Sequence, residues 1–224
     1  MSAKIISTTT SQAMSHVRHM DGSAIASAPA VARISFVASA ASLVALAALH
    51  VLSPEFDPSK RMVSEYALGS FSWVLSSMFL AWALSCVALF VAIKSQVRTT
   101  GGRIGLGLLL LSALGMAMAA IFDVNHNLHG VAALIGMPNL PIAAVFISVS
   151  LGRNPSWNVS RRLLIGTAIL TWVSLILMNI AIFTGFSQTG EANPGAWFGW
   201  ANRFLILAYN VWLMTAAWRM VKSK

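Results

Sequence analysis

Apolar residues fall in six long stretches along the chain, and polar residues gather in the short connections between them. The stretches cover residues 34–52, 70–93, 104–122, 131–151, 163–183 and 200–218. Each approaches the ~20 residues that a helix needs to cross the hydrocarbon core of a bilayer. Strands of a membrane barrel are about half as long and alternate polar with apolar residues, which these stretches do not do. The pattern predicts an all-α fold, an integral membrane bundle of six transmembrane helices.

The composition excludes the other broad classes of protein. Hydrophobic residues make up 57% of the chain and charged residues only 9%, and the mean hydropathy is +0.75. A soluble domain carries about 25% charged residues, so this chain has too few polar groups to cover a water-exposed surface. The apolar content also excludes a disordered chain, and Cys86, the single cysteine, has no partner for an intramolecular disulfide.

The basic residues predict the orientation of the bundle. Two of the 15 Lys and Arg residues, Lys60 and Arg61, lie in the first loop, and Arg203 lies inside the last apolar stretch. The other twelve fall on one side of the predicted membrane: Lys4, Arg18, Arg33, Lys94, Arg98, Arg103, Arg153, Arg161, Arg162, Arg219, Lys222 and Lys224. Because basic residues collect on the cytoplasmic side, both termini are expected in the cytoplasm of a multi-pass cell-membrane protein. Basic residues spread over membrane-flanking loops do not favour a nucleic-acid partner.

The N-terminal residues differ in character from the rest of the chain. Residues 1–31 are rich in Ser, Thr, Ala and Met and show no helical periodicity, so we expect a disordered tail there and a six-helix transmembrane domain over residues 32–224. A late signal sequence after Arg33 is the alternative. It is less favoured because the run of small residues precedes the apolar stretch.

Acidic residues collect on the predicted outer side, where Glu55, Asp57, Glu65, Asp123 and Glu191 all fall. Ser64 and Glu65 stand just before the second stretch. In one interpretation, Ser64 caps the second helix and Glu65 favours its positive N-terminal end. In the other, Glu65 is a proton acceptor or a ligand at the bilayer edge.

The third apolar stretch ends in a polar cluster with the sequence FDVNHNLHG. Asp123, His126 and His129 are three residues apart, so a continuing helix would place them on one broad face. Two imidazoles and a carboxylate are a plausible ligand set for a divalent metal, and histidine also handles protons near neutral pH. A polar hairpin, in which these side chains bond the loop backbone, is the favoured alternative.

Two later spans contain polar or helix-breaking residues. The fourth holds Pro138-Asn139-Leu140-Pro141 near its middle, which predicts a kink facing the bundle interior with Asn139 turned towards protein or cavity. The sixth begins with Asn202-Arg203. An Arg inside a span marks a functional site by default, although it can also snorkel to the headgroups. Because Glu65, Asp123 and Arg203 share a predicted depth, we expect Arg203 to approach one of these carboxylates, directly or through a water, with His129 nearby.

These motifs resemble a known family. Ser64-Glu65-Tyr66 with Gly69, Asp123 with His129-Gly130, and Asn202-Arg203 are similar to motifs of the bacterial six-helix membrane proteins grouped as domain of unknown function 998. The resemblance covers roughly residues 34–218, implies a six-helix membrane protein and supplies no activity. The family pattern often has an acid where Asn202 stands, which weakens a charge pair with Arg203. The polar cluster on the outer side also faintly resembles membrane hydrolases that use Ser, Asp and His at the bilayer edge. This chain lacks the later His-x-x-x-His pair of those enzymes.

Three hypotheses for function follow. The favoured one is a polar, outward-facing pocket that binds or moves a lipid or a small solute. The second is a membrane-embedded hydrolase of lipid that uses a divalent metal held by Asp123, His126 and His129. The third is a structural or assembly protein whose polar residues only join helices. The candidate binding residues form the polar cluster on the predicted outer side: Ser64, Glu65, Asp123, His126, His129, Asn202 and Arg203.

Overall fold

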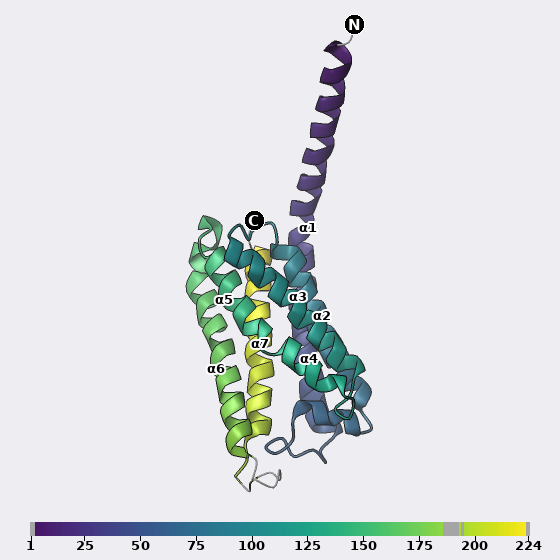
Figure 1. The fold of residues 1–224 in the computed structure, drawn as a ribbon, viewed down its shortest axis with the longest axis vertical. Helices are drawn as coiled ribbons and strands as arrows, with labels where there is room; N and C mark the ends of the chain where they lie inside the picture. Colours follow the sequence, from purple (N-terminus) through teal and green to yellow (C-terminus); the bar gives the residue numbers. More distant parts are fainter. Residues whose placement is uncertain (1–2, 186–192, 194, 223–224) are drawn as a thin grey trace.

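The protein is a bundle of helices that run along one common direction (Figure 1). The computed structural model describes the backbone of residues 3–185, 193 and 195–222, and side chains from residue 28 onward within these ranges. The α-helices are α1 (Ala3–Leu52), α2 (Ser72–Ile93), α3 (Thr100–Ile121), α4 (Leu128–Gly136), α5 (Asn139–Leu151), α6 (Arg161–Gly185) and α7 (Phe198–Lys222). Two 3-10 helices, η1 (Val63–Leu68) and η2 (Pro155–Ser160), lie in the connections. No strand occurs in the described residues.

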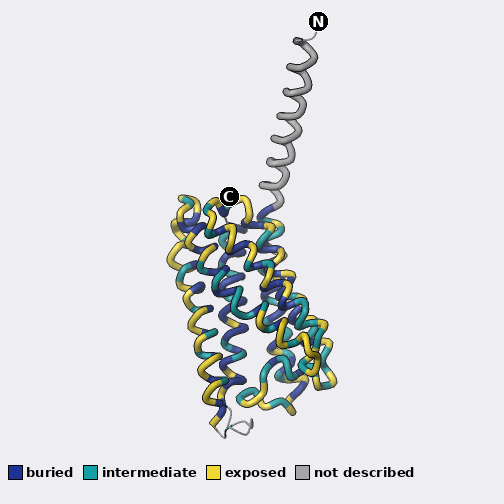
Figure 2. Tube along the Cα trace, viewed as in Figure 1, coloured by how far each residue is buried: buried dark blue, intermediate teal, exposed yellow. Residues whose placement is uncertain are grey.

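Within the described residues, six segments are long and apolar enough to cross a membrane. They are α1 from Ala28, α2, α3, α4 with α5, η2 with α6, and α7. Neighbours in sequence pack side by side, and α7 closes the ring by packing on α1. Figure 2 shows buried positions mainly on the inner sides of the helices and exposed positions on the outer sides. Many of the exposed residues are large and apolar, as expected where lipid is the solvent. The predicted all-α, six-helix membrane bundle is confirmed.

The two ends of the bundle differ in charge. We call the end formed by residues 53–71, 122–127 and the start of α7 the acidic end, because it holds Glu55, Asp57, Glu65 and Asp123. The opposite end, formed by residues 94–99 and 152–160 and by the end of α7, is the basic end (Figure 1). The side chains of Lys4, Arg18, Glu191 and Lys224 lie outside the described residues.

The N-terminal segment differs from the sequence-based expectation. The backbone of α1 is helical from Ala3, whereas we expected a disordered tail over residues 1–31. Ala28 is buried and Val31 packs against the core, so the last residues of the expected tail already pack on the bundle. Alanine has the highest helix propensity, which favours continuation of the helix through this Ala-rich segment. The division into a tail and a domain at residue 32 stays a prediction.

The fourth span is broken into two helices, as its prolines predict. Pro138 precedes α5, and Pro141 lies in the first turn of α5, where a backbone N–H has no acceptor within the helix. The carbonyl of Met137 is left free and accepts a hydrogen bond of 2.7 Å from the hydroxyl of Tyr209 on α7. The amide of Asn139 donates to the carbonyl of Ile135, 2.7 Å away. The kink therefore faces the bundle interior, and α7 satisfies one of its carbonyls.

The break changes the packing of the two halves. The second half, α5, packs on α3 and α6, whereas α4 packs mainly on α3. Small residues hold α3 against α4. Ser112 donates a hydrogen bond of 2.9 Å to the carbonyl of Gly136, and a Cβ at Gly115 would meet the Cα of Gly136 at 2.5 Å. Helices α3 and α4 therefore cross closely at Gly115 and Gly136.

We predict that the acidic end faces away from the cytoplasm, because basic residues concentrate at the opposite end. Single cysteines at Lys60→Cys and Val159→Cys, in a Cys86→Ala background, report the two ends. An impermeant maleimide should label Lys60→Cys in intact cells and Val159→Cys only after permeabilisation. The reverse labelling pattern would overturn the orientation.

Candidate functional site at the acidic end

Arg203 forms the centre of a hydrogen-bond cluster at the acidic end. Its side chain is 6% exposed, and it is the one charged residue buried among the described side chains. Nε donates to Nε2 of His50 at 2.7 Å. Nη1 donates to the carbonyls of Arg61 at 2.8 Å and Gly199 at 2.9 Å, and Nη2 donates to the hydroxyl of Tyr66 at 3.0 Å. These bonds join α1, the first loop, η1 and α7.

Gly199 makes this arrangement possible. A Cβ at this position would meet the carbonyl oxygens of Ser59 and Arg61 at 2.7 Å and would also meet that of Pro58. Its backbone N–H donates to the carbonyl of Ser59 at 2.9 Å. The first loop therefore lies directly on the start of α7, and this contact brings the Arg61 carbonyl within reach of Arg203.

The His50 ring is held in one tautomer. Its Nδ1 lies 2.7 Å from the carbonyl of Leu46, one turn earlier in α1. A carbonyl only accepts hydrogen bonds, so Nδ1 carries the proton, and Nε2 of the neutral ring accepts from Arg203. His50 supplies Arg203 with a neutral acceptor and no negative charge.

None of the carboxylates that the structure describes compensates the Arg203 charge directly. Within the described side chains no carboxylate oxygen lies within 4.0 Å of Arg203, so the expected direct ion pair with Glu65 or Asp123 is wrong. Glu65 instead pairs with Arg61 at 2.6 Å and accepts the backbone N–H of Met62 at 2.8 Å. Glu65 therefore caps η1, whereas the structural interpretation placed it at the start of the second span, which begins only at Ser72.

Asp57 is a carboxylate whose pKa is lowered in part by the positive charge of Arg203. It is fully exposed in the first loop, and its pKa is lowered mainly by hydrogen bonds from the hydroxyl and the backbone N–H of Ser59. The positive charges of Lys60 and Arg203 add smaller contributions. An exposed carboxylate that is screened by water compensates a buried cation only weakly.

Asn202 and Ser64 also lie at this end. The Asn202 carbonyl oxygen accepts the backbone N–H of Val63 at 2.8 Å, which joins α7 to η1. Ser64 lies within η1, and α2 begins only at Ser72 with no side-chain cap at Phe71, so the expectation that Ser64 caps the second span is wrong. Both Ser64 and Asn202 line a cavity described below.

The polar cluster after α3 is a turn. Helix α3 ends at Ile121, so the spacing of three does not place the next residues on one helical face. Asp123 accepts the backbone N–H of Asn125 at 2.8 Å, and His126 accepts that of Leu128 at 3.1 Å. The Nδ1 of His129 lies 2.9 Å from the Phe122 carbonyl.

These contacts are those of a polar hairpin. In the described part of the chain no three His, Cys, Asp or Glu side chains are grouped closely enough to hold a metal ion. The expected ligand set of Asp123, His126 and His129 is therefore not assembled, and these residues instead bond the backbone of the loop.

A groove between α1 and α7 leads to the Arg203 cluster. Its volume is about 560 Å³, and its lining consists of Leu43, Leu46, Ala47, His50, Trp200, Arg203, Phe204 and Leu207. The aliphatic residues lie one to two turns deeper into the bundle than His50 and Arg203. Trp200 is 55% exposed, and the Arg203 guanidinium lies 6.0 Å from its ring centroid. The groove is thus apolar along its length and cationic and aromatic at its acidic end.

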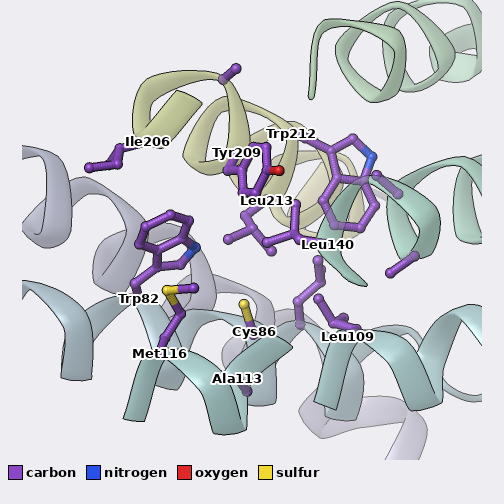
Figure 3. Close-up of a cluster of buried hydrophobic side chains, with 14 of the residues drawn as sticks. Trp82, Cys86, Leu109, Ala113, Met116, Leu140, Ile206, Tyr209, Trp212 and Leu213 are labelled. Carbon is purple, nitrogen blue, oxygen red and sulfur yellow. The ribbon is translucent and has the colours of Figure 1, made fainter. Parts of the chain in front are cut away.

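A second hollow lies inside the acidic half of the bundle. It has a volume of about 310 Å³ and lies among η1, α2, α3, α4, α6 and α7. Its lining is mainly apolar, with Ser64, His129, Asn202 and the indole of Trp82 as the polar groups. Figure 3 shows Trp82 beside Met116, opposite Ile206 and Tyr209 of α7.

The structure brings together only part of the predicted site. Arg203 and Glu65 contact the same residue, Arg61, through its backbone and its side chain respectively. Ser64, His129 and Asn202 share the cavity, whereas Asp123 and His126 serve the turn. Sequence reasoning missed His50 as a partner of Arg203. Its place at the end of the first span, at the same depth as Arg203, was the available signal.

Comparison with protein families matches residues 36–219 to the family described as protein of unknown function (DUF998). The match covers most of the chain, with four of the six membrane spans in full and most of the first and the last. The chain belongs to this family. As a DUF998 member with six apolar spans, it is a multi-pass membrane protein. Comparisons with curated proteins and with solved structures give no match.

Proposed function

We propose that this DUF998 protein binds an anionic phospholipid, whose phosphate meets Arg203 and whose acyl chain lies in the groove between α1 and α7. The observation that carries the proposal is that the described residues supply no counter-charge to Arg203. Its four hydrogen-bond partners are all neutral, and no carboxylate within the described residues pairs with it. A buried cation is stable only with a counter-charge or full hydrogen bonding.

One donor of Arg203 is also left over. A guanidinium has five N–H groups, and four of them are used in the cluster. The second N–H of Nη2 has no acceptor among the described residues. Arginine N–H groups form strong, charge-assisted hydrogen bonds with phosphate oxygens.

The surroundings of Arg203 favour a lipid over a soluble anion. The groove that reaches Arg203 is lined by Leu43, Leu46, Phe204 and Leu207, which suit a hydrocarbon chain. Trp200 stands beside the guanidinium at the level where tryptophan sits among lipid headgroups. A site with a cationic end and an apolar length matches the shape of an amphiphile.

Native mass spectrometry of the protein released from nanodiscs tests the proposal. The nanodiscs contain phosphatidylglycerol and phosphatidylcholine in equal amounts. Wild type should retain one phosphatidylglycerol in preference to phosphatidylcholine, and Arg203→Gln should lower this preference at least tenfold, equivalent to ~1.4 kcal/mol.

Arg103→Gln is the matched control, because Arg103 is an exposed basic residue near the basic end. It should retain the lipid as wild type does. Equal retention by wild type and Arg203→Gln would leave Arg203 as a structural link between α1, the first loop and α7, as the assembly hypothesis states.

A further inference from the structure

A hollow at the basic end joins two cationic side chains to an apolar helix face. It has a volume of about 500 Å³ and lies where η2 leads into α6. We call it the basic hollow, and its lining residues are Asn158, Arg161, Arg162, Ile165, Gly166 and Ile169. None of them lines the groove that reaches Arg203, so the basic hollow is a separate feature on a different helix.

The arginines of the basic hollow have no counter-charge among the described residues. Arg161 and Arg162 are exposed, and neither guanidinium forms a hydrogen bond or an ion pair with another described residue. All carboxylates with described side chains lie at the acidic end. Both arginines also stand in the first turn of α6, where the helix dipole disfavours a positive charge. Two positive charges are therefore available to an anion from outside the chain.

The aliphatic stem of Arg161 is held against the end of α5. A Cβ at Gly152, the residue that follows α5, would meet the Cγ of Arg161 at 3.0 Å and its Cδ at 3.3 Å. This contact restricts the first part of a long side chain, so less rotamer entropy is lost when the guanidinium binds an anion. Arg161 is thus an exposed charge on a partly fixed stem.

An apolar stripe runs along α6 from Arg162 towards the membrane interior. Ile165, Gly166 and Ile169 follow that arginine at spacings of three, four and seven residues, so they share its helix face. At 1.5 Å per residue this face is about 10 Å long. Gly166 leaves a notch in the face, because a Cβ there would meet no atom within 4 Å. No contact with another described helix requires a glycine at this position, and the notch is open to a hydrocarbon chain.

We propose that the basic hollow binds a phospholipid with a phosphomonoester headgroup, whose phosphate meets Arg161 and Arg162 and whose acyl chain lies in the notch at Gly166. A phosphomonoester carries a charge of about −1.5 to −2 near neutral pH and so matches two guanidinium groups. A phosphodiester lipid such as phosphatidylglycerol carries a single negative charge and leaves one arginine unmatched. The lipid therefore differs from the one proposed for Arg203, where a single buried cation meets the phosphate.

Photocrosslinking locates this lipid on the chain. The probe is a phosphatidic acid that carries a diazirine in one acyl chain, added to the protein in phosphatidylcholine nanodiscs. Wild type should be labelled between Leu163 and Leu170, as mapped by mass spectrometry of its peptides. Unlabelled phosphatidic acid should compete for this label at a concentration at least tenfold lower than phosphatidylglycerol. Inorganic phosphate should not compete at the same concentration, because it has no acyl chain.

Two pairs of arginine substitutions separate a site from general attraction to a basic surface. Arg161→Gln combined with Arg162→Gln should lower the label on α6 at least tenfold. Arg98→Gln combined with Arg153→Gln removes two exposed charges from the same end of the bundle, outside the basic hollow. Because salt screens exposed charges at a distance, this second pair should change the label by no more than about twofold.

Gly166→Leu tests the contact with the acyl chain while both charges stay in place. The leucine fills the notch without a clash and should lower the label on α6 at least tenfold. Gly107→Leu is the matched control, because Gly107 is an exposed glycine on α3 whose Cβ would also meet no atom within 4 Å. Arg203→Gln should not change the label on α6, and the α6 variants should not change phosphatidylglycerol retention, so failure of one site is distinguishable from failure of the other.

Four results would each overturn the proposal. They are the absence of label on α6, equal competition by phosphatidylglycerol, an equal loss of label in the two arginine pairs, and full labelling of Gly166→Leu. Competition by inorganic phosphate equal to that by phosphatidic acid would also overturn it, and would identify the basic hollow as a site for a free anion.

Discussion

Arg203→Ala is expected to destabilise the acidic end more than any other single truncation there. The substitution removes four hydrogen bonds at once and leaves His50, Tyr66 and two backbone carbonyls without their donor. Leaving a buried hydrogen-bonding group without its partner costs about 1–3 kcal/mol. The effect is measured as a lower apparent melting temperature of the purified protein in detergent, with loss of monodispersity as the readout.

Arg219→Ala is the control on the same helix. Arg219 lies in the last turn of α7 and donates one hydrogen bond, to the Ser156 carbonyl at 2.6 Å. Its removal should cost about 1 kcal/mol or less. Equal melting temperatures for the two variants would show that the Arg203 cluster does not hold α1, the first loop and α7 together.

A methyl group at Gly115 is expected to separate α3 from α4. The Cβ of Gly115→Ala would meet the backbone N and Cα of Gly136 and, at 2.7 Å, the carbonyl of Ala132. These are backbone atoms that cannot rotate away, so the helices must move apart and the Ser112–Gly136 hydrogen bond must lengthen. We expect a loss of about 2–3 kcal/mol, typical of an overpacked interior.

Gly107→Ala, on the same helix, should leave the stability of the protein unchanged or raise it. A Cβ there meets no atom within 4 Å, and alanine is the better helix former by up to ~1 kcal/mol. A melting temperature that falls for Gly115→Ala and holds or rises for Gly107→Ala supports the close crossing. Equal changes in the two variants would contradict it.

The span pattern and the break in the fourth span were predictable from sequence because each depends on local chemistry. An apolar stretch of about twenty residues has one stable form in a bilayer, the helix. Pro138 and Pro141 remove backbone donors wherever they stand. The partner of the freed Met137 carbonyl, Tyr209, was not predictable, because it depends on how α7 packs against α5.

The candidate site was less predictable because its partners are largely backbone atoms. Arg203 is conspicuous in the sequence, but two of its acceptors are the carbonyls of Arg61 and Gly199, which every residue type has. The prediction that Glu65 and Arg203 lie at the same end of the bundle was correct, since both contact Arg61. Glu65 nevertheless pairs with Arg61, four residues away, because this local contact requires no helix to move.

The end of α3 explains why Asp123, His126 and His129 do not share one face. The spacing of Asp123, His126 and His129 has a common face only if α3 continues, and α3 ends at Ile121. In the turn that follows, Asp123 and His126 accept nearby backbone N–H groups. Short polar side chains after a helix end commonly bond their own loop in this way.

The central claim is that a lipid phosphate lies against the guanidinium of Arg203. Solid-state NMR measures this contact directly, through ³¹P-induced dephasing of the arginine ¹⁵N signals in phosphatidylglycerol bilayers prepared without phosphate buffer. The Arg203 signals are assigned from their loss in Arg203→Lys. We predict that the Arg203 Nη signal is dephased by lipid ³¹P. An Arg203 signal that shows no dephasing, in a sample where the exposed Arg103 signal does, would contradict the claim.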